Sequence, residues 1–305
     1  GRRYMVDLRG ITSLQQVPVK LQPQVASRTL DIRLLYEDVL EVYSAIHRIS
    51  IKQNSGWSLI NTSVRGLTST LLEFKHEEID TLYPSATNFC IILDNTLMDS
   101  RKMERIPFAN PFYYFDSGYL SVLDHNSNIQ WNFNIDMQLR RQCNTRRGTY
   151  YSLYYNGISK SHVNVFAKSI LHRTAPIQNF GLAKYLNVPD GRTYKMYPLH
   201  PGVKDVFHNR GCFAQEYKAG TKIRYSLTIG ETVHDLEYLP HFAVFGGNVI
   251  IPNDGYLELY SKTGSMGVRF DCAECNRDSK LYYTTSGILL LTNNKLYLLN
   301  VKSSS

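Results

Sequence analysis

Two cysteines, Cys272 and Cys275, form the C-x-x-C pair of the sequence. Thiolates at this spacing bind one side of a tetrahedral zinc ion or act as a redox dithiol. A structural zinc site needs two further ligands, and the sequence holds no second C-x-x-C. The other thiols and imidazoles considered have no diagnostic spacing: Cys143, His200, His208 and Cys212. We favour ordinary thiols in a loop, with zinc as the weaker alternative, and expect no cofactor.

Basic residues gather in two stretches between expected strands. The first stretch contains Arg140, Arg141, Arg146 and Arg147. The second contains Arg101, Lys102 and Arg105. Arginine suits bidentate contacts with phosphate or carboxylate groups, so these residues are candidates for nucleic-acid binding. The simpler alternative is a pair of solvated loops that bind nothing.

Catalytic motifs are missing. Ser265 lies in Gly264-Ser265-Met266-Gly267, but Thr263 stands where a nucleophile elbow needs its first glycine. There is no phosphate-binding glycine loop, no H-E-x-x-H and no G-x-G-x-x-G. His234 and Asp235 are neighbours in the sequence, which alone defines no catalytic pair. The sequence predicts that the protein is not an enzyme.

Composition bounds the class of protein and its partners. The 305 residues are 43% hydrophobic and 20% charged, as in an ordinary globular protein. A net charge of +8 favours acidic partners such as nucleic acid, anionic lipid or an acidic protein surface. No stretch is apolar enough to cross a membrane as a helix. Five scattered cysteines favour a reducing, intracellular compartment, the nucleus more than the cytoplasm.

The amino-terminal part contains the segment with the clearest helical spacing. The chain begins Gly1-Arg2-Arg3, without Met or an apolar signal core, so we expect it to start inside a longer protein or after a removed tag. Residues 1–30 form an extended lead-in. Residues 31–50 carry apolar side chains spaced 3, 4, 3, 4, 3, which predicts an amphipathic helix. That stripe consists of Ile32, Leu35, Val39, Val42, Ile46 and Ile49. It either packs on the rest of the domain or binds a partner.

After Ser50 the pattern changes to short apolar or alternating runs separated by turn residues. Tyrosine is abundant, with 22 residues, and aromatic side chains favour strands. Hairpin turns are indicated by Asn156-Gly157, Asp190-Gly191 and Asp254-Gly255. The expected strands include Leu67–Phe74, Phe89–Leu93, Tyr119–Leu123, Tyr150–Tyr155, Ile223–Ile229, Tyr256–Tyr260, Ile288–Leu291 and Leu296–Val301. The pattern predicts an all-β sandwich, barrel or propeller over residues 51–305.

A small polar residue, a glycine and an apolar run recur along the chain. The copies are Ser117-Gly118-Tyr119, Asp254-Gly255-Tyr256 and Ser286-Gly287-Ile288, with Asn156-Gly157-Ile158 as a fourth. The intervals are close to one four-stranded blade. On this pattern, and above all on Tyr282–Val301, the chain resembles a degenerate WD40-type β-propeller. It has no Gly-His or Trp-Asp pair, so no family site is carried over.

The resemblance implies five to seven blades and a rigid platform for protein partners. It also implies closure of the ring by an amino-terminal strand, for which Tyr4–Leu8 is the candidate partner of Leu296–Val301. We therefore expect a non-catalytic scaffold subunit of an intracellular, nuclear multiprotein complex, which docks through the helix and the propeller surface. The alternatives are a nucleic-acid-binding propeller and a substrate receptor of a ubiquitin ligase.

Overall fold

The computed structural model describes most of the chain from residue 26 to residue 301. The described residues are 26–99, 105–107, 112–116, 118–123, 129–136, 138–145, 148–155, 158–165, 169–172, 175–180, 183–190 and 193–301. Within them the secondary structure consists of strands β1 to β30, with no helix. Hence no described helix is long and apolar enough to cross a membrane.

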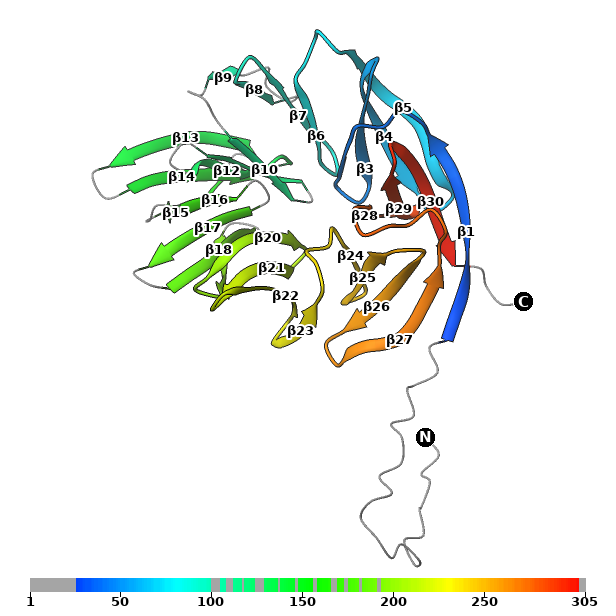
Figure 1. Ribbon diagram of the computed structural model, residues 1–305. Helices are drawn as coiled ribbons and strands as arrows, with labels where there is room; N and C mark the ends of the chain where they lie inside the picture. The colour runs from blue at the N-terminus through cyan, green and yellow to red at the C-terminus, as the bar shows by residue number, and fades with distance from the viewer. Residues whose placement is uncertain are drawn as a thin grey trace, which may run out of the picture.

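The strands form eight antiparallel groups of three or four, which fan out around a common centre (Figure 1). The first two groups are β2 (Glu41–Ser44), β3 (Arg48–Gln53), β4 (Gly56–Ser63), β5 (Gly66–Lys75), and β6 (Thr81–Pro84), β7 (Phe89–Leu93), β8 (Thr96–Asp99), β9 (Arg105–Pro107). The next two are β10 (Phe112–Asp116), β11 (Tyr119–Leu123), β12 (Ile129–Asn134), and β13 (Gln138–Thr145), β14 (Gly148–Tyr155), β15 (Ile158–Val165).

The carboxyl-terminal half repeats the same plan. The fifth and sixth groups are β16 (Ser169–His172), β17 (Ala175–Phe180), β18 (Ala183–Asp190), β19 (Thr193–Leu199), and β20 (Val203–Asn209), β21 (Cys212–Ala219), β22 (Lys222–Ile229), β23 (Thr232–Leu236). The last two are β24 (Ala243–Phe245), β25 (Asn248–Asn253), β26 (Tyr256–Ser261), β27 (Gly264–Asp271), and β28 (Lys280–Thr284), β29 (Gly287–Thr292), β30 (Lys295–Val301) with β1 (Ala26–Tyr36). This is the architecture of a β-propeller.

Tight turns join consecutive strands in the described part of the chain, and the turn predicted at Asp254-Gly255 joins β25 to β26. Asp94 and Asn95 both have positive φ, 49° and 58°, and link β7 to β8. Asn293 and Asn294 do the same between β29 and β30. Two consecutive positive φ angles define the turn that matches the twist of paired strands. The expected strands were therefore confirmed, most of them to within two residues at each end.

The recurring glycine pattern does not mark equivalent positions. Gly118 and Gly287 precede the second strands of their groups, β11 and β29, whereas Gly255 precedes the third strand, β26. The interval from Gly255 to Gly287 is therefore not a blade repeat. The sequence predicted five to seven blades; the described residues form eight strand groups.

The helix predicted over residues 31–50 is wrong, because this segment forms β1, β2 and the start of β3. Along each strand, inward-facing and outward-facing side chains alternate with a period of two. Each reversal of the chain direction shifts this alternation to a new starting residue. The reversals fall at Asp38 and Ile46, whose φ angles are 57° and 67°. Three short alternating runs joined in this way reproduce the 3, 4, 3, 4 spacing of a helix.

Of the six residues assigned to partner binding, three are buried in the core and three are partly buried. Val39, Val42 and Ile49 are buried in a cluster with residues of β29 and β30. Ile32 and Leu35 are partly buried and pack against core clusters, and Ile46 bridges to Thr284 of β28. These residues therefore form no helical stripe, and their role in partner binding stays a prediction.

The strand that closes the ring is β1. Its first part, from Ala26 to Thr29, pairs in parallel with Val268–Asp271 of β27. Its second part pairs antiparallel with β30, with Leu30 opposite Val301. Strand β1 therefore joins two neighbouring sheets into one of eight strands. The closing strand was expected at Tyr4–Leu8, which lies outside the described residues.

Hydrogen bonds from polar side chains hold neighbouring sheets together near the centre. The carboxylate of Asp136 accepts hydrogen bonds from Ser85 Oγ at 2.5 Å and Thr87 Oγ1 at 2.6 Å, and from the backbone N–H of Asn88. Burial alone would raise the pKa of Asp136, but these hydrogen bonds outweigh it and the pKa is lowered. The contact ties the residue that follows β12 to the turn after β6, and so fixes Tyr83 at the centre.

Candidate functional site: a central cavity

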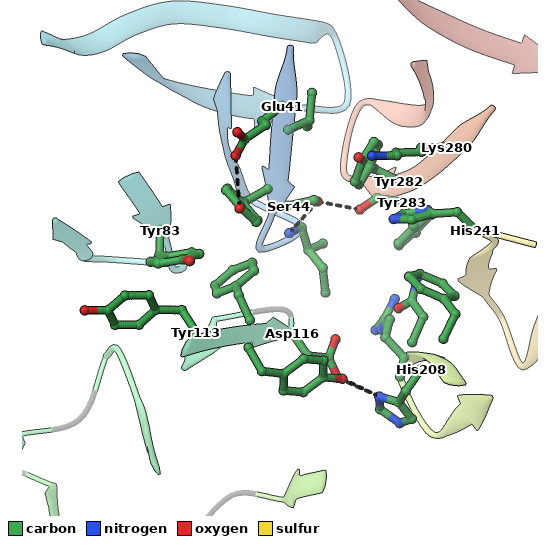
Figure 2. A pocket seen from close by; sticks show the side chains of 18 residues that line it. Glu41, Ser44, Tyr83, Tyr113, Asp116, His208, His241, Lys280, Tyr282 and Tyr283 are labelled. Carbon is green, nitrogen blue, oxygen red and sulfur yellow. Dashed lines mark hydrogen bonds and ion pairs between the residues drawn. The ribbon is translucent and has the colours of Figure 1, made fainter. Parts of the chain in front are cut away.

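A cavity of about 300 Å³ lies where the inner strands meet. Its lining comes from β2, β6, β10, β20 and β28, together with His241 just before β24. Figure 2 shows these side chains pointing inward from opposite sides. Six of the eight strand groups therefore contribute to one site.

One wall of the cavity is a packed aromatic cluster. The ring centroids of Tyr43 and Tyr83 are 4.8 Å apart, and those of Tyr83 and Phe115 are 5.3 Å apart. Burial raises the pKa of Tyr43 and Tyr83, so both phenols stay protonated. Rings this close contact one another and leave no room for a cation between them. The wall is therefore a rigid surface and not an aromatic cage.

The opposite wall is formed by Phe207, His241 and Tyr282. The His241 ring lies 4.1 Å from Phe207 and 5.0 Å from Tyr282, between centroids. Burial, with a smaller contribution from the charge of Lys280, lowers the pKa of His241 to about 3. Its imidazole is therefore neutral at physiological pH. Its Nδ1 is buried and has no hydrogen-bond partner among the described residues.

Four charged side chains line the cavity, and they differ in how they are paired. Glu41 forms an ion pair with Lys52 Nζ at 3.3 Å and accepts a hydrogen bond from the Tyr43 hydroxyl. Asp116 lies 3.0 Å from His208 Nδ1. Arg210 and Lys280 form no ion pair with any carboxylate in the described part of the chain. The charge left unpaired at the cavity is therefore positive.

The Asp116–His208 pair joins β10 to β20 across the site, as Figure 2 shows. His208 Nε2 accepts a hydrogen bond from the backbone N–H of Gly211 at 3.0 Å. An acceptor nitrogen carries no proton, so the hydrogen-bond network assigns the single ring proton to Nδ1, which donates to Asp116. Both ring nitrogens are therefore occupied. His208 has no free nitrogen with which to accept a substrate proton, and the pair serves to position β10 and β20.

Replacing Asp116 distinguishes a neutral hydrogen bond from an ion pair. Asp116→Asn keeps an oxygen that accepts the Nδ1 proton, so we expect a loss of about 1 kcal/mol in the free energy of unfolding. Asp116→Leu leaves a donor buried, since the His208 side chain is 1% exposed, and should cost about 2–3 kcal/mol. Urea unfolding of both variants tests this. Equal losses would show that His208 needs a full negative charge.

Arg210 lies at the edge of the cavity in the two-residue turn between β20 and β21. Its guanidinium is 5.4 Å from the centre of the Tyr283 ring, and Nη1 donates to the carbonyl of Val244 at 3.4 Å. Lys280 begins β28 and pairs at backbone level with His241. Both side chains are exposed, so a bound molecule can reach them.

The cysteine pair lies in the connection between β27 and β28, away from the cavity. Cys272 and Cys275 are free and buried. A hydrogen bond between the two thiols lowers the pKa of Cys272 and raises that of Cys275. Among the described residues no group of three or more metal-ligating side chains exists. The structure thus places no further ligand for zinc beside this pair.

The basic residues predicted to bind nucleic acid fall largely outside the described structure. Arg140 and Arg141 lie on β13. Arg105 begins β9. The others, Arg101, Lys102, Arg146 and Arg147, lie outside the described residues. Their role in binding stays a prediction.

Of the residues predicted to bind a partner, Val42 and Ile46 line the cavity, and so does His208; sequence reasoning missed its aromatic and charged residues. Their signal was the aromatic content of the inner strands, such as Phe112-Tyr113-Tyr114-Phe115 and Tyr282-Tyr283. Because aromatic residues are frequent throughout the chain, nothing marked these particular rings as neighbours. Only the ring of sheets brings them together.

The fold and the site define the chain as a β-propeller with a polar and aromatic central cavity. No protein-family model matches the sequence, and no curated protein matches it significantly. The chain is similar in fold to YCF48 bound to D1 peptide, with 10% identity and a TM-score of 0.44 over 90% of this chain and 95% of that one.

Two further solved structures show the same kind of similarity. The Pan2 WD40 domain of Neurospora crassa has 9% identity and a TM-score of 0.43, covering 88% of this chain and 90% of that one. XC5397 from Xanthomonas campestris, a gluconolactonase, has 11% identity and a TM-score of 0.39, covering 90% of each chain. At such identities the similarity concerns the fold alone.

Proposed function

We propose that this propeller is a non-catalytic interaction protein that binds a protein partner over its central cavity. The observation that carries the proposal is the unpaired positive charge of Arg210 and Lys280 beside packed aromatic walls. Tyrosine, arginine and other large rigid side chains supply most of the binding energy in protein interfaces. Membership of an intracellular, nuclear multiprotein complex belongs to the same proposal.

The chemistry of the cavity supports binding over catalysis. A general base needs a nitrogen or oxygen that is free to accept a proton from a substrate. Both nitrogens of His208 are engaged. The neutral imidazole of His241 lies next to Lys280, whose charge makes that ring a weaker base. The remaining polar groups are better suited to hold a partner than to transfer a proton.

Affinity purification with charge-reversed variants tests the proposal. The cavity variant is Arg210→Glu with Lys280→Glu, and its matched control is Lys204→Glu with Lys222→Glu on the exposed surface of β20 and β22. We expect wild type and control to recover the same partner in near one-to-one amounts, and the cavity variant to lose it. Equal recovery by all three proteins, or no stoichiometric partner, would contradict the proposal.

A further inference from the structure

We infer that the central cavity accepts an acidic side chain of the bound partner, with its carboxylate in contact with Arg210 and Lys280. This inference rests on the proposed function and specifies the chemistry of the residue that is recognised. Both cations line the same cavity and neither has a carboxylate partner among the described residues. An aspartate or glutamate of a partner would supply that missing charge.

The charged side chains that line the cavity come from three strands and one turn. Counted formally, Glu41 and Asp116 would cancel Arg210 and Lys280. Glu41 is already paired with the charge of Lys52, whereas Asp116 accepts only a hydrogen bond from the neutral His208 and keeps its negative charge. One carboxylate charge therefore remains against the two positive charges of Arg210 and Lys280, and the sum at the cavity is positive. In Figure 2, Glu41 and Lys280 come from two different strands, β2 and β28.

His241 strengthens the same side of the cavity. Its Nδ1 is a buried polar atom without a partner, and such atoms are rare in folded proteins. Its imidazole carries no charge at neutral pH, so it can donate or accept a hydrogen bond according to its tautomer. His241 pairs at backbone level with Lys280, which places the two side chains at one edge of the site.

The aromatic walls favour a carboxylate over a nucleobase. Base stacking needs free ring faces, but Tyr83 and Phe115 stack on each other at an interplanar angle of 24°. On the opposite wall Phe207 packs against both His241 and Phe242. Rings that already pack against one another offer fewer free faces to a base. A volume of about 300 Å³ suits one side chain rather than a length of nucleic acid.

A peptide array tests the inference directly. The complete chain is applied to random twelve-residue peptides, acetylated and amidated so that their ends carry no charge. We expect the bound peptides to share one aspartate or glutamate. Titration calorimetry then compares each selected peptide with its Asn or Gln counterpart, for which we expect about tenfold weaker binding.

Variants of the chain locate the contact. For Arg210→Gln and for Lys280→Gln, the acidic peptide and its Asn or Gln counterpart should differ in affinity by less than about threefold. Each variant has already lost one of the positive charges that contact the carboxylate. Lys222→Gln, an exposed control on β22, should keep the tenfold difference. Circular dichroism confirms that the three variants stay folded.

The outcomes separate this inference from the proposed function. Peptides that bind with no acidic preference, yet bind weakly to a Phe115→Ala variant, would leave the proposed function in place and overturn the inference. A carboxylate preference seen only for peptides with a free carboxyl terminus would also overturn it. Binding of twelve-residue oligothymidylate, lost in Lys280→Gln, with no peptide bound would overturn both.

Discussion

Leu30→Asp is expected to lower the free energy of unfolding by about 4 kcal/mol. Leu30 is 8% exposed and packs among Leu257, Phe270 and Leu299, at the point where β1 passes from β27 to β30. An aspartate there would bury a charge with no partner and weaken both contacts of the closing strand. Urea denaturation followed by circular dichroism measures the loss.

Leu34→Asp is the matched control on the same strand. Leu34 also pairs with β30, opposite Tyr297, but its side chain is 44% exposed. The same substitution should therefore cost no more than about 1 kcal/mol. Equal losses for the two variants would contradict the placement of β1 between two sheets.

The size of this effect follows from the role of β1 in the ring. A propeller whose first and last strands do not pair has open sheet edges and lets its first and last groups separate. Strand β1 contacts both β27 and β30, so one short segment holds two groups together. The cavity depends on this closure, because β2 and β28 line it from either side of the join.

Local signals explain which parts of the fold the sequence predicts well. Runs such as Phe89–Leu93 and Tyr256–Tyr260 alternate within a few residues and end at turn dipeptides, so their strands need no distant information. The prediction for residues 31–50 failed because the turns in this segment carry no glycine or proline. Asp38 and Ile46 adopt positive φ without one, and Ile46 does so although it is β-branched.

The cavity depends on long-range pairing that no local pattern encodes. Asp116 and His208 lie in different strand groups, yet they form a polar contact of 3.0 Å across the site. Arg210 becomes notable only because no carboxylate lies within reach, which is a property of the assembled ring. The excess of tyrosine predicted strands but did not show which rings face the centre.

Gly56→Ala is expected to be the most damaging replacement of a glycine that starts a strand. Gly56 begins β4 with a φ of 138°, and a Cβ there would stand 1.9 Å from the carbonyl oxygen of Phe74 on β5. That oxygen belongs to the backbone, so the two strands must separate. We expect a loss of about 3–4 kcal/mol, measured as the shift in the urea midpoint.

Gly246→Ala provides the comparison, because Gly246 also has positive φ, 55°, but a Cβ there meets nothing within 4 Å. It should cost only about 1 kcal/mol, the backbone strain alone.

The strand that Gly56 begins carries Trp57, whose ring stacks on Tyr43 at 5.9 Å between centroids. Separation of β4 from β5 would therefore displace a wall of the cavity. Gly56→Ala should weaken binding of the acidic peptide, whereas Gly246→Ala should leave it unchanged. A larger loss of peptide affinity in Gly246→Ala than in Gly56→Ala would show that the β4–β5 contact does not support the site.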